Sequence, residues 1–140
     1  MLSLAKISAA VDTYLSTPVT FAVYVCGLNL DYMRRQGLQL ITEANARKAE
    51  LLYAAIDASN GYYRAPVHPK YRSLMNVLFF VKESQEWTVK FAQEAEERKL
   101  YYLIGHPAVG GIRASIYNAM SLEGVQALIC FMQDFQLRHP

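Results

Sequence analysis

Hydrophobic and polar positions follow two spacings along the chain, and each spacing predicts a type of element. Apolar residues three and four apart are typical of a helix with one buried face, and short apolar runs between turn signals are typical of strands. The pattern predicts helices over residues 18–37, 38–58, 84–99 and onward from 121, and strands over 73–81, 100–104 and 112–118. The predicted order is therefore α-α-β-α-β-β-α.

This order predicts an α+β fold in a single domain spanning residues 1–140. We expect a sheet of about three strands with helices on one side, because each amphipathic helix must bury its apolar stripe against another layer. A chain of 140 residues suits one domain and is long enough to bury a core. It contains no internal repeat and no low-complexity tract.

The first predicted helix has an unusual distribution of apolar residues. Ser16-Thr17-Pro18 reads as its start, with Thr17 as N-cap and Pro18 as the first helical residue, and Gly37 as its stop. The segment 21–30 is apolar on nearly every face. A helix of that kind is expected to be covered all round, and this predicts a partner surface beyond the domain's own core.

The second and the last predicted helices have clearer faces. In the second, the apolar face is marked by Leu40, Ala44, Ala49, Leu52 and Ile56, and the solvent face by Arg47, Lys48 and Glu50. In the last, the expected inner face consists of Val125, Leu128, Ile129, Met132 and Phe135. Ser84 and Ser121 are the expected N-caps of the third and fourth helices.

Composition and charge argue against several classes of protein. Hydrophobic residues make up 53% of the chain and charged residues 19%, slightly above and below the usual values. The net charge of +2 is too small to predict a nucleic-acid or membrane-surface partner. The uncharged stretch 16–30 is too short for a membrane span, and the first residues lack the features of a signal peptide. We therefore expect a cytoplasmic protein.

Cysteines and histidines predict neither a disulfide nor a metal site. Cys26 and Cys130 lie far apart in apolar helical patterns, which predicts two buried free thiols in a reducing compartment. His68, His106 and His139 lack the spacing of metal ligands.

Several motifs resemble one known family. The segments SLMNVLF, GHPAVGGIRASIYNA and LEGVQALICFM are similar to the C-terminal part of phosphoserine aminotransferase, and STPVTF and KAELLYAAIDASNGYY are similar to the same family in the same order. The similarity extends over about residues 13–139. It implies the small domain of a pyridoxal-phosphate-dependent transaminase of fold type I, which transfers an amino group between glutamate and 3-phosphohydroxypyruvate in serine biosynthesis.

The resemblance also implies what these 140 residues lack. In the family a larger N-terminal domain carries the Schiff-base lysine, the aspartate on the pyridine nitrogen and the ring that stacks on the cofactor. We therefore expect this chain alone to be inactive and to bind no cofactor, with pyridoxal 5'-phosphate present only in a complete enzyme. The expected partners are the missing large domain or a second copy in a homodimer, and a small-molecule substrate.

Arg113 is the main candidate for binding substrate. By spacing alone it is more simply a solvated arginine at the edge of a strand. A guanidinium can instead hold a carboxylate with two parallel N–H donors, and Gly110 and Gly111 before it allow a tight turn. The family resemblance implies the second role, contact with the α-carboxylate of the amino-acid substrate.

Two further sites follow from the resemblance, and each departs from the family pattern. The family motif G-H-R reaches the substrate phosphate across a dimer interface; here His106 matches, but Pro107 replaces the arginine and brings neither a charge nor an N–H donor. The family motif N-T-P binds the cofactor phosphate of the neighbouring subunit; Thr17 matches, and Ser16 replaces the asparagine with a hydroxyl that can still donate.

Two alternatives remain open. The chain is alternatively a non-catalytic interaction or dimerisation domain derived from the family, with the apolar segment 21–30 as its docking surface. A third possibility is a module that senses an amino acid through Arg113.

Overall fold

The computed structural model describes residues 19–140. No helix in this part of the chain is long and apolar enough to cross a membrane. The chain divides into two compact units with the boundary between Leu38 and Gln39.

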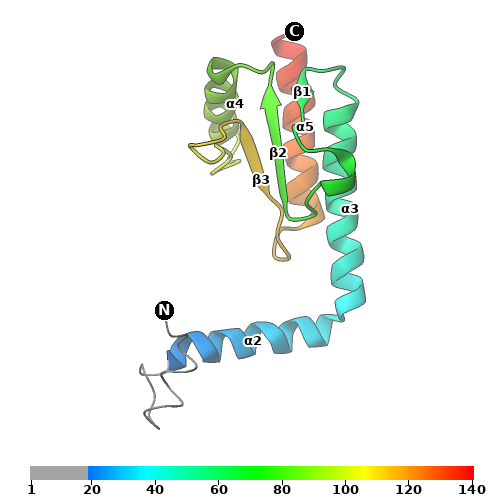
Figure 1. The fold of residues 1–140 in the computed structure, drawn as a ribbon, viewed down its shortest axis with the longest axis vertical. Coiled ribbons are helices and arrows are strands. Elements are labelled where there is room, and N and C mark those ends of the chain that lie inside the picture. The colour runs from blue at the N-terminus through cyan, green and yellow to red at the C-terminus, as the bar shows by residue number, and fades with distance from the viewer. Residues whose placement is uncertain (1–18) are drawn as a thin grey trace, which may run out of the picture. The chain divides into compact units, whose positions relative to one another are not determined.

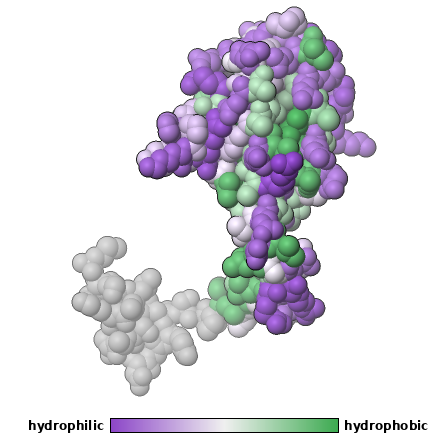
Figure 2. Space-filling model, turned by 90° about the vertical axis from the view of Figure 1, so that its right-hand side faces the viewer, coloured by the Kyte–Doolittle hydropathy of each residue, from purple (hydrophilic) through white to green (hydrophobic). Residues whose placement is uncertain are grey.

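The first unit contains helix α2, Thr20–Gln36. It begins later than the predicted start at Pro18, with Val19 in the N-cap position and no side-chain cap. Thr17 lies outside the described residues. The helix ends as predicted at Gly37, whose φ of 87° suits a residue without Cβ. None of its residues is buried, and hydrophobic side chains are visible on its surface in the lower part of Figure 2.

The second unit is an antiparallel sheet covered by helices. Its elements are α3 (Leu38–Asp57), β1 (Tyr63–Arg64), the 3-10 turn η1 (Pro69–Tyr71), β2 (Asn76–Val81), α4 (Gln85–Glu97), β3 (Ile112–Ser115) and α5 (Leu122–Arg138). The strands lie in the order β1-β2-β3. Helices α3, α4 and α5 lie on one side of the sheet (Figure 1), so the predicted α+β fold is confirmed.

Strand alternation explains where the core lies. Along β2 the side chains of Val77, Phe79 and Val81 are buried, and those between them are only half-buried, as expected when one face of a sheet packs on helices. Helix α5 contributes the other side of the core through five buried residues, namely Val125, Leu128, Phe131, Met132 and Phe135. Ile129, predicted on the inner face, is only half-buried against the core.

The predicted strand over residues 100–104 is wrong. In this segment Ile104 makes only an isolated antiparallel bridge to Ile112. Lys99 and Tyr102 have φ of 64° and 60°, and these left-handed conformations break an extended run. The third strand is instead β1, which lies between the predicted helix over residues 38–58 and the predicted strand over 73–81, where no element was predicted.

The predicted N-caps are confirmed, and the predicted burial of the two thiols is not. Ser84 and Ser121 cap α4 and α5 as predicted, accepting hydrogen bonds from the N–H groups of Trp87 and Gly124. The expected burial of the thiols is wrong: Cys26 and Cys130 are free but exposed. Cys130 lies on the outer side of α5, between the core-facing positions of the helix.

Candidate functional site

A hairpin brings two of the predicted site residues onto one structural element. Gly105 N donates a hydrogen bond to Gly111 O at 2.8 Å, and Arg113 N donates to Leu103 O at 2.7 Å. These bonds close the loop that begins with His106 and ends on β3 with Arg113. The loop is therefore held at its base by backbone contacts, and both side chains lie on the same hairpin.

The glycines of this loop are required by close backbone approach. A Cβ on Gly105 would lie 2.3 Å from Gly110 O, and a Cβ on Gly111 would lie 2.8 Å from Phe79 O. Gly111 also has a φ of +71°, a backbone conformation that residues other than glycine rarely adopt. The GG pair thus allows the loop to pack directly on β2.

Arg113 is exposed and lies on the side of β3 opposite to the core. Its neighbours Ile112 and Ala114 are buried, and its partner across the sheet is Leu78. Together with segment 99–103 and the start of α5, it lines a cleft of 570 Å³. Within residues 19–140, no hydrogen bond or ion pair engages the guanidinium. Its five N–H donors are thus available to an anion.

His106 is exposed at the start of the loop. Its Nδ1 accepts a hydrogen bond from Ala108 N at 3.2 Å, so in the neutral ring Nε2 carries the hydrogen and can donate. Its carbonyl oxygen accepts from Val109 N and Gly110 N. The intervening Pro107 leaves this turn without a cationic side chain.

The other predicted site residues, Ser16 and Thr17, lie outside the described residues, so their relation to a cofactor remains a prediction. The described lysines differ in burial. Lys48 is the buried one in residues 19–140, and its Nζ donates to the carbonyl oxygens of Ile116, Tyr117 and Met120 at 3.2, 2.8 and 2.9 Å.

The helical periodicity placed Lys48 on the wrong face of α3 and gave no sign that Asn45 has a structural role. Lys48 was predicted on the solvent face of α3 but is only 3% exposed, and burial lowers the pKa of its amine. Asn45 Nδ2 donates to Asn118 Oδ1 at 2.7 Å. Both hold the turn that follows β3 and precedes α5. Lys48 lies about one turn after Asn45 on α3, and the local sequence gave no signal of either contact.

A second cleft, of 1130 Å³, lies elsewhere on this unit. It is lined by the turn at Ser59–Tyr62, by Lys82 and Glu83, and by the end of α5. It contains none of the predicted site residues. Among the described residues, no cluster of histidine, cysteine or carboxylate side chains could hold a metal ion.

Comparison with known proteins identifies the family. The family model "Aminotransferase class-V" matches residues 5–128. The chain belongs to the class-V aminotransferases. The chain is 52% identical over 125 residues to chloroplastic phosphoserine aminotransferase 2 of Arabidopsis thaliana, covering 89% of this chain and 29% of that protein. It is 49% identical over 132 residues to phosphoserine aminotransferase of Xanthomonas euvesicatoria, covering 94% and 36%.

Solved structures agree with this class-V assignment. Phosphoserine aminotransferase from Bacillus circulans matches with a TM-score of 0.88 at 35% identity, over 99% of this chain and 39% of that chain. The pyridoxal-phosphate-bound enzyme from Trichomonas vaginalis matches with a TM-score of 0.81 at 34% identity, over 92% and 37%. The predicted resemblance to phosphoserine aminotransferase is confirmed, and the chain spans about a third of the length of these relatives.

Proposed function

We propose that this chain serves as the small domain of a phosphoserine-aminotransferase-like enzyme. The complete enzyme would transfer an amino group between glutamate and 3-phosphohydroxypyruvate in serine biosynthesis. Pyridoxal phosphate, when bound, would supply the carbonyl group that accepts the amino group. The chain's own contribution is substrate orientation, and it does not transaminate alone.

The unengaged guanidinium of Arg113 beside the 570 Å³ cleft carries this proposal. A bidentate contact with the substrate's α-carboxylate fixes the rotation of the Cα substituents, which a transaminase needs in order to present one Cα–H bond. The hairpin supports the contact because its base is closed by two backbone hydrogen bonds. Ser16 and Thr17 are proposed on the cofactor phosphate, as the family resemblance implies.

Phosphate recognition is the part of the proposal in which this chain departs from the family. His106 is proposed near the phosphate end of the substrate, with Nε2 as its donor. Pro107 supplies no charge, and a charge-assisted hydrogen bond is worth about 1.5–3 kcal/mol. We therefore propose that the chain binds phosphorylated substrate more weakly than a G-H-R relative does.

A titration of the ¹⁵N-labelled chain with glutamate and with phosphoserine tests both assignments. We expect amide shifts centred on residues 105–115, and their loss in Arg113→Gln. Arg98→Gln is the matched control, since Arg98 is exposed and pairs with Asp134 instead. In a dimer, where this loop would reach the substrate of the neighbouring copy, Pro107→Arg should tighten the binding of phosphoserine by about tenfold or more and leave the binding of glutamate unchanged. Shifts that persist in Arg113→Gln would contradict the carboxylate role.

One observation favours a second candidate function, a non-catalytic interaction or dimerisation domain. Helix α2 buries none of its residues, and Phe21 and Val19 are 77% and 70% exposed. Exposed apolar surface of this extent marks an interaction site. Sedimentation velocity tests this candidate: a monomer at all concentrations, unchanged by Phe21→Ser, would count against self-association through α2.

A further inference from the structure

The outer edge of β3 is only partly paired. In an antiparallel ladder, alternate residues direct their backbone N–H and C=O groups to the same neighbour. Val77 pairs with Ala114, and Ile116 N donates to Met75 O, so Ala114 and Ile116 bond toward β2. Arg113 and Ser115 consequently direct their N–H and C=O groups away from β2.

On that outer side, a second short ladder stops before it reaches Ser115. It contains the bond from Gly105 N to Gly111 O and the bond from Arg113 N to Leu103 O. The same register would next pair Ser115 with Tyr101. No backbone bond joins these two residues in the described part of the chain.

The interruption has a conformational cause. Tyr102 has a φ of 60° and Lys99 a φ of 64°, and together they direct segment 99–102 away from the strand. Residues with a side chain rarely adopt such conformations, which cluster at sites where the strain serves a function. The result is an exposed turn, with Tyr102 93% exposed.

The 570 Å³ cleft lies where the ladder is interrupted. The aliphatic residues that line it are Leu100, Leu103, Ile116, Val125 and Leu128, and Tyr101 and Tyr102 stand at its rim. An unpaired strand edge beside an apolar cleft is the combination that binds an extended peptide, because backbone bonds give affinity and the cleft receives alternate side chains.

The charge of the cleft restricts the partner. Its lining includes Lys99 and Arg113 and no carboxylate. Neither cation has an ion-pair partner within residues 19–140. A second copy of this chain docked edge to edge would bring like charges together, which disfavours it, whereas acidic side chains would be attracted.

We propose that the edge of β3 at Ser115 binds an extended segment of another protein, in which apolar and acidic residues alternate. The segment adds as a strand, bonding to Ser115 N–H and to the outward carbonyls of residues 113 and 115. Its apolar side chains enter the cleft, and a carboxylate meets Lys99. This binding uses the backbone of Arg113 and does not depend on the substrate role of its guanidinium.

A blocked hexapeptide of alternating valine and glutamate tests the proposal with the ¹⁵N-labelled chain. We expect saturable shifts centred on residues 113–116 and slower solvent exchange of the Ser115 amide. The same peptide N-methylated at a central residue should bind about tenfold more weakly, because it loses a backbone donor. A valine–lysine peptide should also bind more weakly, by about three- to tenfold. These comparisons leave the protein's fold untouched.

A charge reversal on the protein sharpens the test. Lys99→Glu should lower the affinity for the valine–glutamate peptide by about three- to tenfold and raise the affinity for the valine–lysine peptide. Lys70 is an exposed lysine outside the cleft, so Lys70→Glu should change neither affinity. Equal binding of the N-methylated peptide, or shifts away from β3, would overturn strand addition. Ser115 shifts that appear on concentration without peptide would assign the edge to a second copy. Free glutamate should shift residues near Arg113 without slowing solvent exchange of the Ser115 amide, and slowed exchange of that amide with glutamate alone would overturn strand addition.

Discussion

Helices α2 and α5 have the same length, 17 residues, and opposite environments. Helix α5 buries five residues in the core, among them Phe131 and Phe135, whereas α2 buries none. Both are rich in apolar residues, so hydrophobicity alone does not decide which becomes part of a core. A core also needs a covering surface, which the sheet and helix α4 supply to α5.

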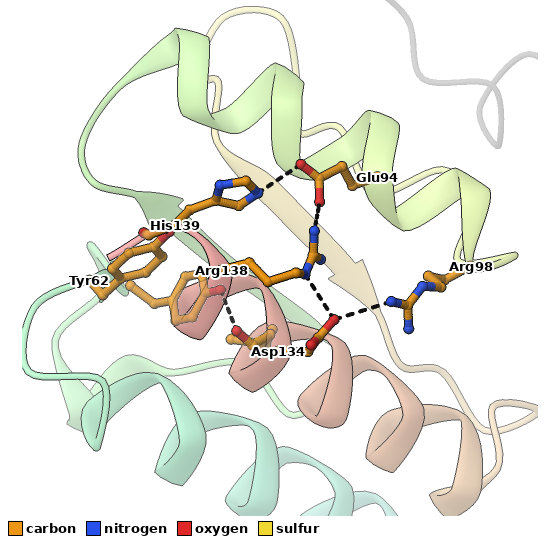
Figure 3. A network of polar contacts seen from close by, with 8 residues as sticks. Tyr62, Glu94, Arg98, Asp134, Arg138 and His139 are labelled. Carbon is orange, nitrogen blue, oxygen red and sulfur yellow. Dashed lines mark hydrogen bonds and ion pairs between the residues drawn. The ribbon is translucent and has the colours of Figure 1, made fainter.

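The polar contacts of the two helices differ in the same way. The ion pairs of α2 join Asp31 to Arg34 and Arg35 within the helix. At the end of α5, Arg138 pairs with Glu94 of α4, and His139 Nε2 lies 2.9 Å from the other oxygen of the same carboxylate (Figure 3). Contacts between elements make α5 part of a cooperative unit, and contacts within one helix do not.

The largest expected difference concerns one aromatic ring in each helix. Phe135→Ala should destabilise the fold by about 3–5 kcal/mol, since the ring is fully buried and packs 5.0 Å from the ring of Phe91. Phe21→Ala should change stability by no more than about 0.5 kcal/mol, because that ring is 77% exposed. Urea unfolding followed by circular dichroism measures both. Similar losses in the two variants would mean that α2 is covered in solution.

The next effect concerns the turn that leads into α5. Lys48→Met should cost about 2 kcal/mol, because it leaves three carbonyl oxygens without their donor. The control is Arg47→Met, whose side chain is exposed and pairs only with Glu50; it should cost less than about 0.5 kcal/mol. Equal midpoints of urea unfolding for the two variants would show that the buried amine does not anchor the turn.

A smaller effect is expected at the helix caps. Ser121→Ala should cost about 1 kcal/mol, because the hydroxyl accepts the N–H of Gly124 at 3.2 Å. Val19→Ala, at the N-cap of α2, should have almost no effect, since valine makes no cap bond there. The midpoint of thermal unfolding, measured for both variants, tests this difference. A lower midpoint for Val19→Ala alone would contradict the assigned roles of the two caps.

The last effect, which falls below that of the cap in acid, depends on pH. Burial opposes ionisation of Glu94, but hydrogen bonds from Arg138 and His139 outweigh it and lower the pKa of the carboxyl group overall. Its folded pKa is then below its unfolded value, so the carboxylate stabilises the fold above about pH 4.5. That contribution is lost as the pH falls through the folded pKa.

Glu94→Gln should therefore cost about 1 kcal/mol at pH 7 and progressively less in acid. Asp31→Asn in α2 should cost less than about 0.5 kcal/mol at pH 7, because both arginine partners are more than 70% exposed. Stability curves from pH 3 to 8 measure the two variants. A Glu94→Gln deficit that grows toward low pH would contradict the assigned direction of the pKa.

The sequence predicted most of this fold because its strongest signals are local. Gly37 ends α2 as predicted, Ser84 and Ser121 cap helices, and the apolar run over residues 73–81 predicted the strand that contains β2. The errors lie where tertiary contacts decide. Tyr102 adopts a left-handed conformation that no local sequence pattern predicts. The two-residue strand β1 is defined by its pairing with β2.

The same distinction applies to the candidate site. The GG pair before Arg113 correctly indicated a tight loop. Arg113 lies at a cleft, and its substrate role stays a prediction. The buried position of Lys48 was missed because its partners lie about 70 residues further along the chain, as the separations of 68 and 72 show. No helical period can report a contact of that range.

Trp87, the single tryptophan of the chain, lies where α4 meets α5. Its indole is 6.3 Å from the ring of Phe135 and 5.6 Å from that of His139, and Lys82 Nζ lies 4.2 Å above it. Its fluorescence emission is therefore an intrinsic reporter on the docking of α5, with a cationic quencher already in place. The emission of this one indole should therefore change when the C-terminal helix detaches from α4.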